Sequence, residues 1–193
     1  MAFIPNRALR ILLITDCMVW LASAMIGPIY AIFVEQIRGN VMDAGITGGI
    51  YALAAGLTTI VSGAYSDRIK KSERVIVLGY VLVGFTYLLF TLVDSMMSLL
   101  MVQTFLGISA GVYAPVYKAI YSRNLDENKE CTGWSFWEAS TYFAIAGGAS
   151  LGGFLAYFCG FNAVFVTMAA LCFASAACLH ILSRHVFLNL RKG

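Results

Sequence analysis

The sequence predicts an all-α integral membrane protein that crosses the bilayer with six helices. Of its 193 residues, 60% are hydrophobic and only 12% are charged, whereas about a quarter of the residues in soluble domains carry charge. Its mean hydropathy is +0.81. The apolar runs are continuous rather than alternating, which is typical of membrane helices and not of β-barrels. Their lengths are close to the roughly 20 residues that a helix needs to cross a bilayer.

The expected spans follow one another with short connections and predict a single transmembrane domain over residues 1–193. They cover residues 9–34, 44–66, 75–93, 97–121, 133–158 and 163–183. The first is too long for the apolar core of a signal peptide, so we expect it to remain as an anchor. The second and third contain no charged residue, and a short basic turn separates them. A loop rich in charge follows the fourth, and a brief connection separates the last two.

Lysine and arginine residues predict the orientation of these spans. Arg38 lies between the first and second spans. The other twelve of the thirteen basic residues lie at the two termini, in the 67–74 turn and in the 118–132 loop. Basic residues accumulate on the cytoplasmic side of membrane proteins. We therefore expect both termini in the cytoplasm and a multi-pass location in a prokaryotic plasma or inner membrane.

Two of the three prolines occupy similar local sequences. Pro28 precedes Tyr30 and Pro115 precedes Tyr117, each by two residues. The first proline falls toward the outer end of its span and the second toward the inner end. Two inverted three-helix repeats would produce this pattern, and chance is the alternative. In either case proline removes a backbone hydrogen bond and bends its helix.

The turn between the second and third spans reads Gly-Ala-Tyr-Ser-Asp-Arg-Ile-Lys-Lys-Ser-Glu-Arg, starting at Gly63. Through Gly63, Asp67, Arg68 and Lys71 it resembles the loop between the second and third helices of major facilitator superfamily transporters, although a lysine replaces the second glycine. The resemblance implies half of that family's twelve-helix fold. It also implies a gating loop in which Asp67 caps a helix of the other half. Attraction of the basic residues to anionic lipid is the alternative.

Glycine pairs in the fourth and fifth spans extend this resemblance in part. Gly107 and Gly111 fit the family's fourth helix, with Gln103 in place of its arginine. The fifth span is similar to the glycine-rich motif of family antiporters, with alanine in place of its proline. The glycines of that motif are Gly148, Gly152 and Gly153. Gly45 and Gly49 form a similar pair in the second span. Small residues four apart let helices approach closely, so these pairs either pack one bundle, or those of spans two and five form the contact with another half.

Asp16 is the sharpest functional candidate because it lies within the first span, about 9 Å deeper than Arg10 at 1.5 Å per residue. A charge there costs on the order of 2.5–3.5 kcal/mol, and such residues face a cavity or a partner. Helical spacing places Trp20 and Tyr30 on the same face. We expect a cavity wall in which Asp16 binds a proton or a cationic group. The alternative is that it pairs with Arg10 or reaches the interface.

Side chains of the fourth and fifth spans supply the remaining candidates. Gln103, Tyr113 and Tyr117 are expected to line the same cavity, as the first and fourth helices of the family do. Alternatively, Gln103 only forms a hydrogen bond between helices. Glu138 and Tyr142 share a face near the inner end of the fifth span, where they form a second protonatable site or an interfacial structural contact.

These features favour a secondary active transporter of a small organic solute, coupled to protons. One six-helix bundle lacks the second bundle that would close a central transport site. We therefore expect a parallel homodimer in which Asp16 of each copy faces one shared cavity. A subunit that needs a different half and a scaffold that transports nothing are the alternatives. The five cysteines form no ligand-like cluster and the net charge is only +3, so no metal, cofactor, enzymatic activity or nucleic-acid partner is expected.

Overall fold

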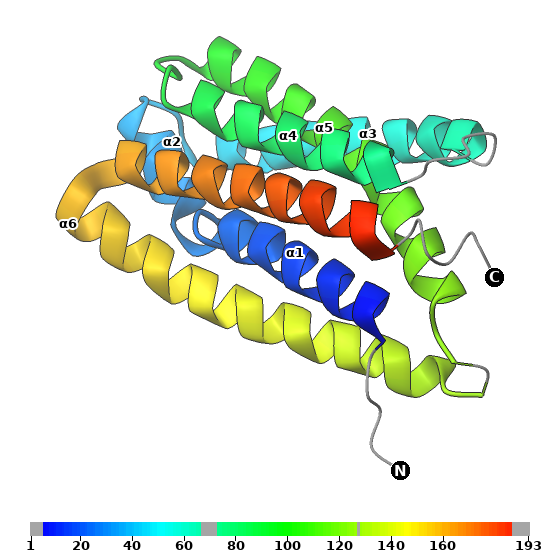
Figure 1. Cartoon of the computed structure of the whole chain (residues 1–193). Coiled ribbons are helices and arrows are strands. Elements are labelled where there is room, and N and C mark those ends of the chain that lie inside the picture. Colours follow the sequence, from blue (N-terminus) through cyan, green and yellow to red (C-terminus); the bar gives the residue numbers. More distant parts are fainter. Residues whose placement is uncertain (1–5, 67–72, 127, 187–193) are drawn as a thin grey trace.

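The computed structural model describes residues 6–66, 73–126 and 128–186, with side chains as far as residue 182. Within these residues the regular structure is helical, and five helices, counting the first with its short continuation, are long and apolar enough to cross a membrane. Figure 1 shows them as one bundle. Asp67, Arg68 and Lys71, to which the family resemblance assigns a gating role, lie outside the described residues.

The first span is a helix broken near one end. Helix α1 covers Arg7–Ala24, a 3₁₀ turn labelled η1 covers Gly27–Ile29, and the short helix α2 covers Tyr30–Gln36. The Asn6 side chain caps α1 by accepting a backbone N–H of its first turn at 2.9 Å. The break falls at Pro28, which lacks an N–H and is favoured in the first turn of a new helix. The span expected over 9–34 is therefore interrupted at this proline.

Helix α6, Glu130–Val186, consists of two helical arms that meet at Gly160. The backbone angles of Gly160 are φ 81° and ψ 171°, a conformation that is essentially restricted to glycine. Figure 1 shows the chain reversing direction at this point. The spans expected over 133–158 and 163–183 fall on the two arms.

The other three long helices are α3 (Val41–Ser66), α4 (Glu73–Phe90) and α5 (Met96–Arg123). A capping box begins α5, in which the Ser95 and Ser98 side chains each accept the other residue's backbone N–H. Helix α4 ends three residues before the expected boundary at 93, because the backbone turns there with short-range hydrogen bonds.

Two helix pairs and one connecting helix make up the bundle. Helix α3 packs against α5, α1 packs against α6, and α4 contacts both α5 and α6. Gly107 and Gly111 of α5 face the backbone of α3, where an added Cβ would collide with the carbonyl oxygens of Tyr51 and Ala55. Only glycine therefore permits the close approach of α3 and α5.

Helix α1 lies between the two arms of α6. On the first arm, Gly148 lies directly against the carbonyl oxygen of Leu21 in α1, and Gly152 against that of Met25, the residue that ends α1. On the second arm, the Ser175 hydroxyl donates a hydrogen bond to the Thr15 carbonyl oxygen at 2.7 Å. A Cβ added at Gly153 would meet no atom within 4 Å. The paired glycines of α5 and α6 thus pack helices within this chain, whereas Gly153 does not.

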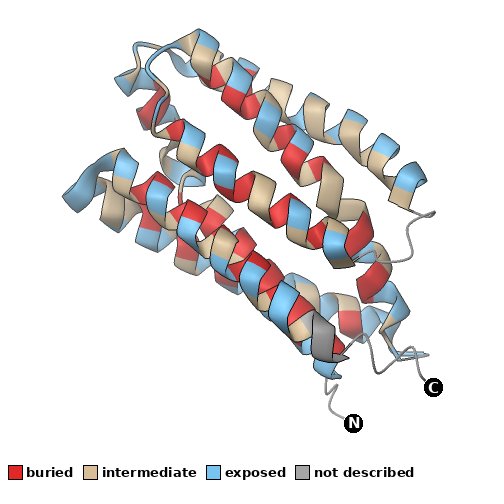
Figure 2. Cartoon of the chain, turned by 45° about the horizontal axis from the view of Figure 1, so that its top comes forward, coloured by how far each residue is buried: buried red, intermediate tan, exposed pale blue. Residues whose placement is uncertain are grey.

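Apolar side chains cover the outside of the bundle as well as its interior. Figure 2 shows that the buried residues lie along the helix faces that meet one another. Helix α3 is the most exposed, since Thr47 is the only buried residue along its described length. Leu57, Val61 and Tyr65 of α3 are each at least 60% exposed. Such a surface would be unfavourable in water, but it suits contact with lipid chains. The protein is accordingly an integral membrane protein.

Candidate functional site

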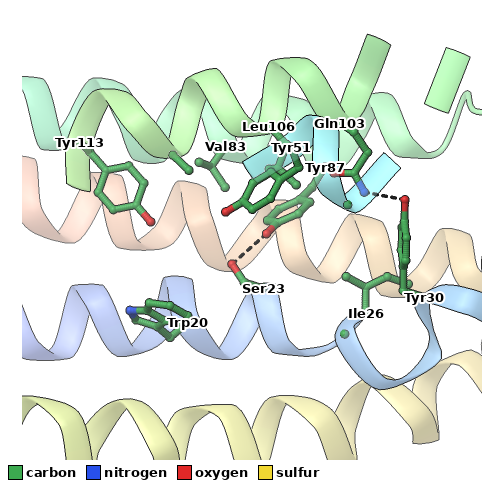
Figure 3. A pocket seen from close by; sticks show the side chains of 13 residues that line it. Trp20, Ser23, Ile26, Tyr30, Tyr51, Val83, Tyr87, Gln103, Leu106 and Tyr113 are labelled. Atoms are coloured by element: carbon green, nitrogen blue, oxygen red, sulfur yellow. Dashed lines mark hydrogen bonds between the residues drawn. The ribbon is translucent and has the colours of Figure 1, made fainter. Parts of the chain in front are cut away.

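A cavity of about 320 Å³ lies between α1, α3, α4 and α5. Its aromatic and polar lining residues are Trp20, Ser23, Tyr30, Tyr51, Tyr87, Gln103 and Tyr113. Figure 3 shows the hydroxyl groups of the α3, α4 and α5 tyrosines directed into the space that Trp20 and Ser23 of α1 face. Among the described lining residues there is no aspartate, glutamate, lysine, arginine or histidine.

Helical spacing explains how these walls form. On α5 the lining residues are Gln103, Leu106, Ala110 and Tyr113. They are separated by three, four and three positions, so they lie on one face of the helix. On α3 the lining includes Gly48, where an added Cβ would meet no atom within 4 Å. The absent side chain leaves the space that the cavity occupies.

Side-chain hydrogen bonds tie the cavity walls together. The Gln103 amide donates to the Tyr30 hydroxyl at 2.7 Å, and the Tyr30 and Thr47 hydroxyls lie 2.7 Å apart. These contacts join α2 to both α5 and α3. Ser23 and Tyr87 form a further hydroxyl pair at 2.8 Å, which joins α1 to α4. Each such bond contributes roughly 0.5–1.5 kcal/mol. Separating the helices that form the cavity walls would therefore require new contacts that replace these hydrogen bonds.

Asp16 lies beside this cavity but does not line it. Its side chain is only 3% exposed. The Trp137 indole nitrogen donates to Asp16 Oδ2 at 2.8 Å, and the Tyr80 hydroxyl donates to Oδ1 at 3.3 Å. No ion pair to Asp16 is present among the described residues. Two neutral donors thus hold a carboxyl group that water does not reach.

One layer of aromatic rings separates Asp16 from the cavity. Tyr113, which lines the cavity, packs edge-on against Tyr80 with ring centroids 4.9 Å apart. Tyr80 in turn donates to the carboxyl group. Trp20 also lines the cavity, and it lies four residues from Asp16 on the same face of α1. A ligand in the cavity would touch Tyr113, which packs against the donor Tyr80, without touching the carboxyl group itself.

The structure separates the sequence-predicted candidates into three groups. Four of them line the cavity: Trp20, Tyr30, Gln103 and Tyr113. Asp16 and Tyr117 lie behind the lining, and the buried Tyr117 hydroxyl has no hydrogen-bond partner among the described residues. Glu138 and Tyr142 lie apart from the cavity on an exposed face of α6, with the Tyr142 hydroxyl 3.5 Å from the Glu138 carboxylate.

Sequence reasoning missed Tyr51 and Tyr87, which lie in the second and third expected spans, where no residue is charged. A signal for one of them was present in the spacing. Thr47 and Tyr51 are four residues apart, so two hydroxyl groups share one face of a helix in the expected second span. Hydroxyl groups in the hydrocarbon region are expected to face a partner or a cavity rather than lipid.

The assembled side chains offer hydrogen bonds, aromatic surfaces and one buried carboxyl group. Among the described residues no group of three histidine, cysteine, aspartate or glutamate side chains lies close enough to hold a metal ion. The arrangement suits reversible binding of a small organic molecule in a mainly apolar pocket with a few polar contacts.

Comparison with known proteins gives two findings. The family model described as Major Facilitator Superfamily matches residues 12–189. A protein of Methanocaldococcus jannaschii, described as an uncharacterized MFS-type transporter, is 26% identical over 157 residues. That match covers 77% of this chain and 40% of the relative. The chain therefore spans about two fifths of the length of the curated relative that it matches.

Proposed function

Because the chain belongs to the major facilitator superfamily, we propose that it is a secondary active transporter of a small organic solute. In this proposal transport is coupled to protons and proceeds by alternating access. The observation that carries it is the cavity between α1, α3, α4 and α5, lined by aromatic rings and hydroxyl groups. Transporters of this kind bind substrate where two helix groups meet and move those groups relative to each other.

The proposal assigns six membrane crossings to the chain, with both termini in the cytoplasm of a prokaryotic cell. The reversal of α6 at Gly160 supports the sixth crossing, because each arm has the length of a span. The break at Pro28 and the proline within α5 at Pro115 support two inverted three-helix repeats.

A second bundle completes the transport pathway in this proposal, and we infer that a second, parallel copy of this chain provides it. Alternating access needs two bundles that move against each other. Gly45 and Gly49 of α3 support a docking face, because a Cβ added at either glycine would meet no atom within 4 Å. The paired glycines of α5 and α6, in contrast, are already packed within the chain.

Asp16 is the proton-binding group of the proposal. An isolated carboxylate out of water is unfavourable unless it is neutralised or fully hydrogen-bonded. The described residues provide Asp16 with two neutral donors and no ion pair. Its hydrogen bond with Tyr80, whose ring packs against the lining residue Tyr113, connects it to the cavity wall, so that substrate and proton occupancy influence each other. Thermodynamic linkage makes this influence reciprocal.

Transport is tested with purified protein in proteoliposomes and a broad panel of solutes. We expect solute flux driven by a pH gradient. Asp16→Asn should abolish this accumulation but allow exchange of solute across the membrane. Glu138→Gln is the matched control, since Glu138 is exposed and does not line the cavity, and it should transport normally. Absence of flux across the whole panel would favour the scaffold alternative, and unchanged coupling in Asp16→Asn would remove that residue from the proton pathway.

Stoichiometry is tested by single-molecule photobleaching of labelled protein in a native-like bilayer. A predominant population with two bleaching steps supports the homodimer. A persistent one-step population contradicts it and favours a subunit that requires a different partner half.

A further inference from the structure

The chemistry of the cavity lining carries an inference about the substrate, which rests on the proposed transport function. We propose that the cavity selects uncharged, ring-bearing solutes with hydroxyl or carbonyl groups over organic cations and anions. The sequence alone leaves this open, since Asp16 on the same helix face as Trp20 is equally compatible with a cationic substrate. The placement of the two residues in the structure distinguishes these possibilities.

The lining offers no charged partner to an ionic solute. Its described residues include neither acidic nor basic side chains. Asp16, on the adjacent part of α1, is 3% exposed, and both of its oxygens already accept hydrogen bonds. An ion that enters a mainly apolar cavity loses its hydration and needs a paired charge as compensation. The cavity does not supply one.

The aromatic side chains are arranged for hydrogen bonding more than for attraction of a cation. Cation–π attraction requires the charge to lie over the face of a ring, within about 6 Å of its centroid. Figure 3 shows that Tyr51, Tyr87 and Tyr113 instead direct their hydroxyl ends into the cavity. Trp20, on the opposite wall, provides one ring for stacking.

Hydrogen-bonding groups in the lining have capacity for a neutral ligand. Among the described residues, no hydrogen bond involves the hydroxyl group of Tyr51 or Tyr113 or the carbonyl oxygen of Gln103. Hydroxyl groups both donate and accept, and the amide oxygen accepts. Together they match hydroxyl, carbonyl or amide groups on a solute without demanding a charge. The apolar remainder of the wall, such as Val83 and Leu106, suits the body of a ring.

Equilibrium binding tests the inference separately from transport. Purified protein in lipid nanodiscs is mixed with sets of aryl sugars that share one ring framework: an uncharged glucoside, an anionic glucuronide and a cationic glucosaminide. Binding is measured by thermal stabilisation and by equilibrium dialysis. We expect the uncharged member of each set to bind at least about tenfold more tightly than either charged member, a difference of about 1.4 kcal/mol.

Conservative variants show whether binding uses this cavity. Tyr51→Phe and Tyr113→Phe should each weaken binding of the glucoside by about three- to tenfold, the effect of one lost hydrogen bond. Tyr157→Phe is the matched control, because Tyr157 is 83% exposed, and its affinity should equal that of the wild type. Each variant removes one oxygen, so folding is checked by its unliganded melting temperature.

The outcomes distinguish this inference from the proposed function. Preference for the glucoside, together with weaker glucoside binding in the two cavity variants, supports the inference even if proteoliposomes show no flux. Preference for a charged member, equal binding of all three, or binding to none overturns it. Flux of charged solutes driven by a pH gradient also overturns it, while it leaves the transport proposal intact.

Discussion

The close packing of α1 against α6 predicts opposite effects for two adjacent glycines. A Cβ added at Gly152 would collide with the backbone of Met25, whereas a Cβ added at Gly153 would meet no atom within 4 Å. Gly152→Ala should therefore destabilise the protein relative to Gly153→Ala. The two variants add the same methyl group one residue apart, so each serves as the control for the other.

The size of the difference follows from two effects. In both variants, replacing glycine by alanine within a helix favours the helical state by about 1 kcal/mol. Overpacking a close contact costs about 1–3 kcal/mol. The obstacle at Gly152 is a main-chain carbonyl group, which cannot rotate away as a side chain would. The variants should therefore differ by about 1–3 kcal/mol, and Gly153→Ala should equal or exceed the wild type in stability.

Thermal unfolding in a mild detergent, followed by helical circular dichroism, measures this difference. For a chain of this length, 1 kcal/mol corresponds to about 2–4 °C in Tm, so Gly152→Ala should melt at least about 2 °C below Gly153→Ala. Gly148→Ala and Gly147→Ala repeat the comparison one turn earlier, since Gly148 faces the Leu21 carbonyl and Gly147 faces open space.

Equal melting temperatures within both pairs would refute the packing of α1 against the first arm of α6. Ligand binding gives a second measure of the same contact. Helix α1 carries Trp20 and Ser23 into the cavity, so its displacement by Gly152→Ala should also weaken binding of the uncharged solutes. Gly153→Ala should leave that affinity unchanged.

Three further predictions concern single contacts. Gly79→Ala places a Cβ 2.5 Å from the Tyr113 Cβ atom, so it should lower stability by about 1–3 kcal/mol and weaken ligand binding in the nanodisc assay. Trp137→Phe removes a donor from the buried Asp16 and should cost about 1–3 kcal/mol, measured as a lower Tm; an unchanged Tm would contradict the hydrogen bond. Gly160→Ala places a side chain at φ 81° and should cost about 1–3 kcal/mol, and a wild-type unfolding midpoint in denaturant would exclude this backbone conformation.

The family and the membrane class were predictable from the sequence because hydropathy is a local property. Continuous apolar runs indicate lipid-spanning helices wherever they occur in a chain. The resemblance carried by Gly63 and the charged turn after it pointed to the family that the match over residues 12–189 shows. An acidic residue within an apolar span, such as Asp16, is itself a signal of a buried functional group, because a charge exposed to lipid is costly.

Faces of helices were predictable only in part. Helical spacing correctly placed Trp20 and Tyr30 on one side of the first span, and both line the cavity. The same spacing placed Asp16 with them, yet its carboxyl group turns toward α4 and α6, where Tyr80 and Trp137 donate to it. Periodicity defines a face, but only neighbouring helices decide which edge of that face meets a cavity.

The partners of each residue were decided by tertiary structure alone. The sequence of Gly148 and Gly152 resembles that of Gly45 and Gly49, since both pairs have a spacing of four. In the structure the first pair packs against α1 and the second faces open space. The contribution of Tyr87 to the cavity was likewise hidden in a charge-free span. Apolar composition drives a helix into the membrane without specifying its neighbours, because lipid and protein interiors are similarly apolar and close packing selects the contacts.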